Sequence, residues 1–331
     1  MRIDNSALAG PISLALAVLA VVLLVTPLIG SATVDFAAAL QGVSPHAEIL
    51  FAARLPRVLL AALAGGALAL AGLLFQALVR DSLADPYTLG VSAGASLGAV
   101  LAICLRLNML VGMPAVGAAA LLGASTVLAM VMGLASRGRR MSSFTLLLAG
   151  VTMNSLSIAV ILFLHNLADF GQSFAIVRWL MGGIEAELYS TLAFLAVVIL
   201  ATAAYVFRQA RVWNLLSVGE EWAEARGVAA TRYLRLGFFA GSVLTALVTA
   251  FTGPIGFLGW IVPHALRLRY GADHRLLVPC AFLYGAAFLA VCDTVARTIL
   301  APTEIPVGVI TAMVGGPFFL WLLGSRGRRV I

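Results

Sequence analysis

A short charged stretch interrupts a chain that is otherwise almost entirely apolar. It runs from Gly219 to Gly227 and contains three glutamates, one tryptophan and one arginine. A chain embedded in lipid concentrates charge only where it meets water or a partner. Glutamates beside an aromatic ring are typical of a protein–protein contact rather than of bond-making chemistry. We therefore expect a short docking helix here, with a solvated loop as the bland alternative.

Residues for an enzymatic site within the apolar runs are scarce. Such a site needs a constellation such as His-Glu-x-x-His or paired aspartates, whereas His165, His264 and His274 stand apart from one another. Asp293 precedes Arg297 by four residues, a spacing that predicts a structural ion pair on one helix face. The pattern indicates a chain that is not itself catalytic and holds no metal.

A phosphate-binding loop of the G-x-x-x-x-G-K-[ST] kind and a lysine Schiff base are also excluded, because all 21 basic residues are arginine and the chain has no lysine. A phosphate-binding loop and a Schiff base both require lysine. If ATP drives this protein, the ATP and its magnesium must lie on a separate ATPase chain, and no cofactor is expected on this one. Cys104, Cys280 and Cys292 are odd in number and lie in or beside apolar runs, as small packing residues do.

Composition indicates a polytopic helical membrane protein. Of 331 residues, 62% are hydrophobic and 11% are charged, and the mean hydropathy is +1.06. A soluble domain could not bury that much apolar surface. The net charge of +7 does not indicate nucleic-acid binding, because the arginines stand at the ends of apolar runs, where they set topology.

Apolar runs of about 20 residues predict ten membrane spans, an all-α fold. The spans are expected near residues 11–30, 58–79, 90–107, 114–136, 143–165, 189–207, 236–252, 258–270, 274–296 and 306–323. The eighth is short and follows a Gly/Pro cluster at 253–259, which is typical of an interrupted helix. A surface helix is expected at about 172–182. Gly90, Gly94 and Gly98 have G-x-x-x-G spacing, which predicts close packing of a neighbouring helix.

The distribution of arginines predicts the orientation. With the N-terminus inside, sixteen arginines are cytoplasmic and five are outside, a strong positive-inside bias. Both termini and the charged stretch would then face the cytoplasm. The first apolar run, residues 12–29, is longer than the core of a typical signal peptide, so we expect a retained span.

Three of the five outer arginines run against this bias. Arg54 and Arg57 flank Leu55-Pro56 at the start of the second span, and Arg297 closes the ninth. Arginine is a good planar, bidentate partner for a carboxylate on another protein. Snorkelling toward the membrane interface is the alternative, and spacing alone favours it.

Nine sequence blocks together resemble the FecCD-type permeases, the membrane subunits of type II ABC importers such as those for vitamin B12. The blocks are Arg54-Leu-Pro-Arg57, Leu83-Ala-Asp-Pro86, Leu89-Gly-Val-Ser-Ala-Gly94, Trp179-Leu-Met-Gly182, Gly219-Glu-Glu221, Gly253-Pro-Ile-Gly-Phe257, Ile261-Val-Pro-His264, Asp293-Thr-Val-Ala-Arg297 and Glu304-Ile-Pro-Val-Gly308. The resemblance covers nearly the whole chain from the second span onward. One departure is that Asp81-Ser82 stands where the family commonly has Asn-Pro.

This resemblance implies a vitamin-B12-importer-like fold with a single transmembrane permease domain, residues 1–331. Two permease copies, expected to be a homodimer, would sit above two cytoplasmic ATPase subunits, and a periplasmic binding protein would dock outside. It implies that Arg54, Arg57 and Arg297 pair with acidic residues of the binding protein, and that Ser142 and Ser143 lie at the cytoplasmic gate. The ATPase-coupling segment would span about 212–232, and its matching residues are Gly219, Glu220, Glu221, Trp222, Glu224, Arg226 and Gly227.

The substrate implied by the resemblance is a bulky metal chelate, either a ferric siderophore or haem, moved across the bacterial inner membrane. Cobalamin is the alternative cargo. A secondary transporter driven by an ion gradient is a remote alternative, because ion-driven transport does not explain the acidic segment.

Overall fold

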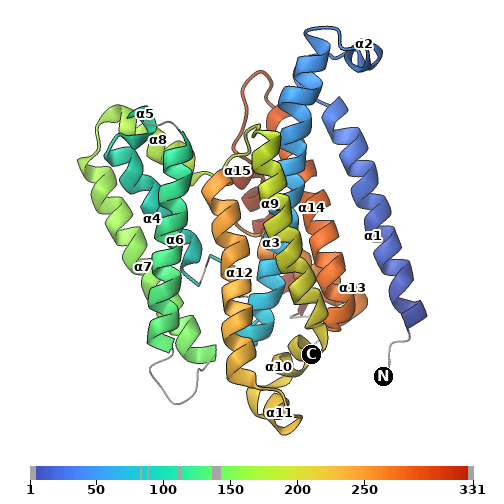
Figure 1. The fold of residues 1–331 in the computed structure, drawn as a ribbon, viewed down its shortest axis with the longest axis vertical. Coiled ribbons are helices and arrows are strands. Elements are labelled where there is room, and N and C mark those ends of the chain that lie inside the picture. Colours follow the sequence, from blue (N-terminus) through green and yellow to red (C-terminus); the bar gives the residue numbers. More distant parts are fainter. Residues whose placement is uncertain (1–4, 83, 88, 111–112, 136–142, 327–331) are drawn as a thin grey trace.

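The computed structural model describes residues 5–82, 84–87, 89–110, 113–135 and 143–326, and every regular element in these ranges is a helix (Figure 1). In chain order these are α1 Asn5–Val25, η1 Thr26–Leu28, α2 Phe36–Leu40, η2 Glu48–Arg54, α3 Leu55–Val79, α4 Val91–Cys104, α5 Leu107–Leu110, α6 Met113–Ala135, α7 Ser143–Leu167, α8 Phe170–Leu180, α9 Tyr189–Arg208, α10 Ala210–Val218, α11 Glu220–Ala225, α12 Ala230–Thr252, α13 Leu258–Tyr270, α14 His274–Thr298 and α15 Val307–Arg326.

Each of the ten predicted spans corresponds to one of these helices, which confirms the all-α membrane fold. Seven helical stretches in the described ranges are long and apolar enough to cross a bilayer. The predicted span at 90–107 is shorter in the structure, 14 residues, chiefly because the helix ends at Cys104, ahead of Arg106 with φ +57°. At ~1.5 Å per residue, α4 reaches only ~21 Å of a ~30 Å hydrocarbon core.

The predicted surface helix at about 172–182 is α8, which begins two residues earlier than expected. Asp169 accepts a hydrogen bond from the backbone N–H of Gln172, and the Gln172 side chain accepts one from the backbone N–H of Asp169. This reciprocal capping box fixes the helix start. The interrupted helix is also confirmed, because α12 ends at Thr252 and α13 begins only at Leu258.

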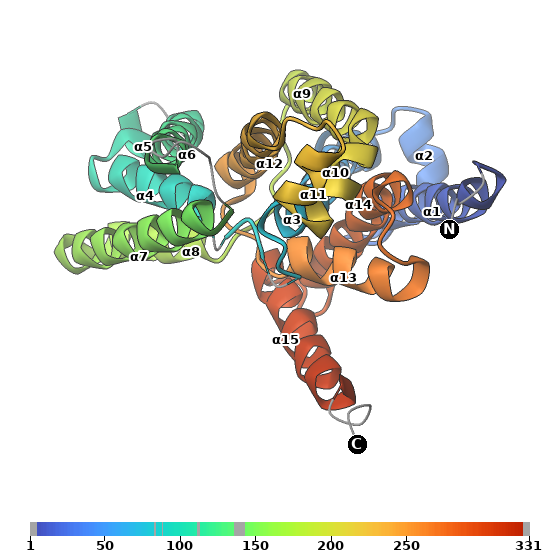
Figure 2. The ribbon, with the colours of Figure 1, turned by 90° about the horizontal axis from the view of Figure 1, so that it is seen from below.

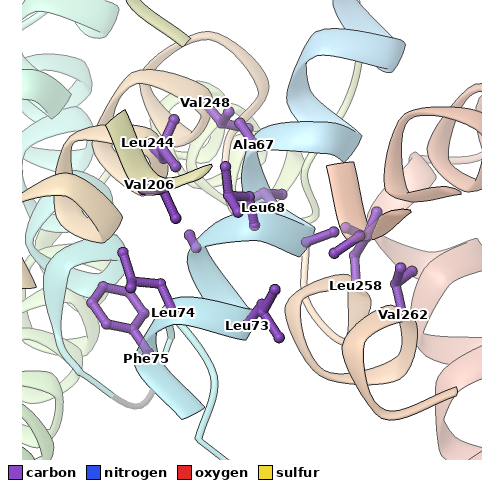
Figure 3. Packing of buried hydrophobic residues seen from close by; sticks show 14 of the residues in the cluster. Ala67, Leu68, Leu73, Leu74, Phe75, Val206, Leu244, Val248, Leu258 and Val262 are labelled. Carbon is purple, nitrogen blue, oxygen red and sulfur yellow. The ribbon is translucent and has the colours of Figure 1, made fainter. Parts of the chain in front are cut away.

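Helix α3 is the centre of the molecule. It is surrounded by α9, α12, α13 and α14, and its side chains Leu68, Leu74 and Phe75 are fully buried among them (Figure 3). Gly65 on α3 meets the backbone of Gly285 on α14, so a Cβ at either position would collide with the facing helix. Lipid supplies no hydrophobic force between helices, and this close backbone contact is what holds α3 and α14 together.

A second group of helices, α4 to α8, packs beside α12 (Figure 1). The predicted small-residue face is confirmed here. A Cβ on Gly94 would meet the carbonyl of Gly123 on α6, and one on Gly98 would meet the carbonyl of Ala119. Helices α1 and α15 lie at the periphery, and α15 projects from the body when the molecule is seen from below (Figure 2). Only 6% of the apolar window of α1 is buried.

Candidate functional site

The two ends of the molecule carry the residues that the sequence singles out. Helices α10 and α11 lie at one end, below α3, α9 and α12, and this is called the α11 end (Figure 1). The η2 segment, the start of α3 and the end of α14 lie at the opposite end, called the η2 end. Helix α1 begins at the α11 end.

Helix α10 is anchored to the helical body by a buried aromatic residue. Trp213 is fully buried, and its Nε1 donates a hydrogen bond of 2.8 Å to the carbonyl of Val206 on α9. Its ring meets Tyr233 of α12 edge-on, with 6.2 Å between centroids. This contact between an aromatic side chain and its neighbours fixes α10 against α9 and α12.

A polar contact ties α10 to the turn between α13 and α14. Asn214 donates to Asp273 Oδ1 at 2.9 Å, and its own Oδ1 accepts from the backbone N–H of His274 at 2.8 Å. Burial alone would raise the pKa of Asp273, but hydrogen bonds from Arg275 and Asn214 outweigh it and lower that pKa to about 2. Asp273 is therefore ionised at neutral pH, and α10 moves together with this turn.

Glu220, the first residue of α11, joins three elements. Its Oε1 accepts from Ser143 Oγ at 2.7 Å and from an Arg80 guanidinium nitrogen at 3.4 Å. Ser143 opens α7, and its Oγ also lies 2.6 Å from the carbonyl of Leu78 near the end of α3. A hydroxyl has one proton, so Ser143 shares it between these two acceptors. A displacement of α11 would thus reach both the end of α3 and the start of α7.

The structure brings the predicted gate residue Ser143 into direct contact with the predicted coupling residue Glu220. Sequence separation conceals this contact, since the two lie 77 residues apart. Ser142, the other predicted gate residue, lies outside the described residues. Gly219 is buried and its backbone is extended, so α10 turns into α11 at this position without strain.

The outward face of α11 presents an aromatic ring among charges. Trp222 is 60% exposed, and the Arg226 guanidinium lies 5.6 Å from the centre of its ring. Glu221 and Glu224 are also exposed, whereas Ala223 between them is fully buried against the body. Gly227, with φ +81°, donates to the carbonyl of Glu224 and ends the helix. Trp222 and Arg226 are of the residue types that are enriched in protein–protein contacts.

At the η2 end, the three predicted docking arginines point into the protein. Arg54 is 6% exposed and donates to the carbonyls of Pro27, Leu28 and Ala32. These acceptors belong to the turn that follows α1. Arg54 therefore holds this turn against the start of α3.

Arg57 forms the tightest ion pairs of the η2 end. One of its guanidinium nitrogens lies 3.0 Å from Asp293 on α14, and another lies 2.8 Å from Glu304 in the loop before α15. Asp293 is completely buried, whereas the Glu304 side chain is 52% exposed. The inner partner of Arg57 is thus fixed and its outer partner is accessible to water.

The ion pair predicted from spacing between Asp293 and Arg297 is present, at 3.7 Å. Arg297 also donates to the carbonyl of Thr26 at 2.7 Å. Sequence reasoning missed the closer partner of Asp293, which is Arg57, 236 residues away along the chain.

No cluster of three metal-ligating side chains exists among the described residues, and Cys104, Cys280 and Cys292 are free thiols. What the structure offers is an exposed aromatic and acidic face at one end and a charge network within the chain at the other.

Comparison with known proteins identifies the family of this chain. A model of the FecCD transport family matches residues 16–325. The chain belongs to this family. It is a multi-pass permease of a type II ABC importer, and the family's membrane subunit is not itself catalytic. Membership excludes the alternative of a secondary transporter driven by an ion gradient.

Two relatives and one solved structure illustrate the similarity. The cobalamin import permease BtuC of Halobacterium salinarum is 42% identical over 303 residues, covering 90% of this chain and 80% of the relative. The hemin transport permease HmuU of Yersinia pestis is 41% identical over 273 residues, covering 82% and 81%. A structure described as an inward-facing metal-chelate type ABC transporter aligns with a TM-score of 0.85 at 30% identity, covering 95% of this chain and 98% of the other.

Proposed function

We propose that two copies of this chain form the path of an importer that moves a bulky metal chelate, a ferric siderophore or haem, into the cytoplasm. Two ATPase subunits, which hold the ATP and magnesium, would dock below, and a binding protein would deliver the chelate from the periplasm. The observation that carries this proposal is the position of α11. Its outer face is exposed, and its first residue, Glu220, is hydrogen-bonded to the start of α7.

The proposed coupling follows the contacts of Glu220. A movement of the ATPase would be passed to Glu221, Trp222 and Glu224 on the exposed face of α11. Because Glu220 holds Ser143 and Arg80, the same movement would displace the start of α7 and the end of α3. Bistable, hydrogen-bonded elements of this kind amplify small shifts into larger ones.

On the outer side, we propose that Arg57 alone among the three arginines touches the binding protein. Arg54 and Arg297 donate to buried carbonyls and would position the turn after α1. Arg57 has one exchangeable partner, Glu304, and a carboxylate of the binding protein could replace it. Arginine is well suited to hold two carboxylates at once because its donors form a rigid planar fork.

The orientation and location rest on the arginine bias. The α11 end and both termini would face the cytoplasm, and the protein would lie in the inner membrane of a bacterial cell. Cobalamin is the second candidate cargo, because a relative named for cobalamin import is as similar as one named for hemin transport.

Uptake by reconstituted complexes tests the proposal. The permease, its ATPase and its binding protein in proteoliposomes should take up one of three cargoes, a ferric siderophore, hemin or cobalamin, only when ATP is inside. The permease alone should neither bind nor hydrolyse ATP. Uptake without ATP, or ATP turnover by the isolated permease, would contradict the proposed function.

A further inference from the structure

An apolar groove opens on the side of the molecule formed by α1, α13 and α14. Its volume is about 480 Å³, within the ~300–1,000 Å³ of ordinary ligand sites. The lining side chains include Val18 and Val22 of α1, Val262 and Leu266 of α13, and Phe288 and Val291 of α14. Figure 2 places α1, α14 and α13 next to one another at one edge of the body. The sparse burial of α1 leaves this edge facing the lipid.

One end of the groove is basic and lies near the membrane surface. Arg269 and Tyr270, the last two residues of α13, line that end. Among the described residues, neither Arg269 nor its neighbour Arg267 forms an ion pair, whereas nearby Arg275 is held by Asp273 at 2.7 Å. Arg269 is exposed and stacks only against the Tyr270 ring, at 5.5 Å. One exposed cation, Arg269, therefore stands at the mouth of an apolar groove without an ion-pair partner among the described residues, and Arg267 lies two residues before it in the chain.

The length of the groove matches one lipid leaflet. Arg269 lies five residues before the start of α14, and the α14 side chains that line the groove, Tyr284 to Val291, follow that start by 10 to 17 residues. At ~1.5 Å per residue they lie ~15–26 Å along the helix. Half of a ~40–45 Å bilayer is ~20–22 Å, headgroup included. A molecule that fills the groove thus has a charged end at the surface and an apolar end near the middle of the membrane.

We propose that this groove binds an anionic phospholipid from the leaflet at the α11 end. Its phosphate lies at Arg269, with Arg267 adding to the local positive charge, and an acyl chain lies along Val262 and Phe288. The bound lipid fills the space between α1 and the α13–α14 pair and so fastens a helix that the protein itself covers poorly. This site is independent of ATP coupling and of cargo.

Lipid retention by the purified full-length chain tests the site. The chain is reconstituted in nanodiscs with equal amounts of phosphatidylglycerol and phosphatidylcholine, extracted in mild detergent and examined by native mass spectrometry. Wild type should keep one phosphatidylglycerol per chain in preference to phosphatidylcholine. Arg269→Gln should weaken retention about five-fold, the equivalent of ~1 kcal/mol per basic residue near an anionic headgroup, and the double variant with Arg267→Gln by more.

Two further variants make the test specific. Arg235→Gln removes an exposed arginine of α12 at the same end, away from the groove, and should retain lipid as wild type does. Ala265→Phe places a ring in the groove from an exposed position of α13 and should reduce retention without changing the thermal unfolding temperature. Equal retention of the two lipids by wild type would overturn the proposal. So would an unchanged Arg269→Gln variant, or loss in Arg269→Gln without loss in Ala265→Phe.

Discussion

The two ends of this permease carry charges in similar sequence settings and use them differently. At the η2 end, Arg54, Arg57 and Arg297 are bonded to carbonyls and carboxylates of the same chain. At the α11 end, one charged residue, Glu220, is bonded inward, while Glu221 and Trp222 remain on the exposed face. The η2 end is therefore a closed network, in which the charged groups are bonded within the chain. The α11 end is a prepared surface, in which an aromatic and acidic face is exposed.

The difference shows that a charged residue at a membrane boundary indicates where the chain leaves the lipid. It does not by itself indicate what the residue does there. Charge in an apolar chain must reach water, a partner or a counter-charge. Which of the three applies depends on what the fold brings near it. At the η2 end the counter-charges come from the end of α14 and the loop before α15, so docking there requires an exchange of partners. At the α11 end it requires none.

The largest expected effect follows from breaking the closed network. Asp293→Asn removes the buried counter-charge that Arg57 and Arg297 share. Arg57 keeps Glu304, but the buried Arg297 loses its ion-pair partner, and leaving a buried charge unpaired costs ~3–5 kcal/mol. We expect a marked drop in the thermal unfolding temperature of the purified permease. Glu185→Gln, which removes one partner of an exposed ion pair with Arg178, is the control and should cost at most ~1 kcal/mol. Equal unfolding temperatures of the two variants would show that the network does not stabilise the fold.

The next effect should appear at the exposed face and leave stability unchanged. Trp222→Ala removes an aromatic side chain that is 60% exposed. If Trp222 becomes buried under the ATPase, its loss should cost ~2 kcal/mol, about 30-fold in affinity. Titration of the ATPase onto permease in nanodiscs measures this. Phe170→Ala, which removes an exposed ring of α8, should change nothing. Unaltered affinity in Trp222→Ala would leave α11 as a solvated segment.

The helical fold could be predicted from the sequence because its signals are local. Apolar runs marked ten helices, seven of which fall in stretches long and apolar enough to cross a bilayer; the 253–259 cluster marked the break before α13, and the spacing of Gly94 and Gly98 marked the contact with α6. The pair of Asp293 and Arg297 was likewise visible four residues apart. Local patterns of this kind survive in the three-dimensional structure.

The bonding partners of the candidate site residues were not visible in the sequence, because they are distant along the chain. Arg57 meets Asp293 and Glu304 across 236 and 247 residues, and Glu220 meets Ser143 across 77. The packing of α3 against α14, and of α10, the helix before α11, against α3, brings these groups together. For this reason the sequence predicted that the outer arginines are special without predicting that they are buried.

An intermediate effect is expected at Glu220, which joins α11 to the start of α7. Glu220→Gln keeps the shape of the side chain but removes the charge that Ser143 and Arg80 contact. Hydrogen bonds to charged groups contribute ~1.5–3 kcal/mol. We expect about ten-fold less transport per ATP hydrolysed, with ATPase affinity retained. Glu221→Gln should show the opposite pattern, a modest loss of affinity with normal coupling. Identical behaviour of the two variants would mean that Glu220 is not the link.

The smallest effect tests whether a carboxylate of the binding protein can replace Glu304 as a partner of Arg57. Glu304→Ala leaves Arg57 held by Asp293 and frees the guanidinium nitrogen that faced Glu304. If a carboxylate of the binding protein competes with Glu304, removing the competitor should strengthen docking. Exposed pairs contribute only ~0.2–1 kcal/mol, so the gain should be between about 1.4-fold and five-fold. Salt screens such a pair, so the gain should shrink as ionic strength rises.

A titration of the binding protein onto permease in nanodiscs, at low and at high salt, distinguishes exchange from a merely structural network. Glu185→Ala is the matched control, because it frees Arg178 from an exposed pair without touching Arg57. If Glu304 occupies the docking position, only Glu304→Ala gains affinity, and only at low salt. If both variants gain equally, the binding protein responds to net charge rather than to Arg57. Weaker docking by Glu304→Ala would mean that Glu304 itself supports the contact, and the network at the η2 end would then act as a scaffold that does not exchange partners.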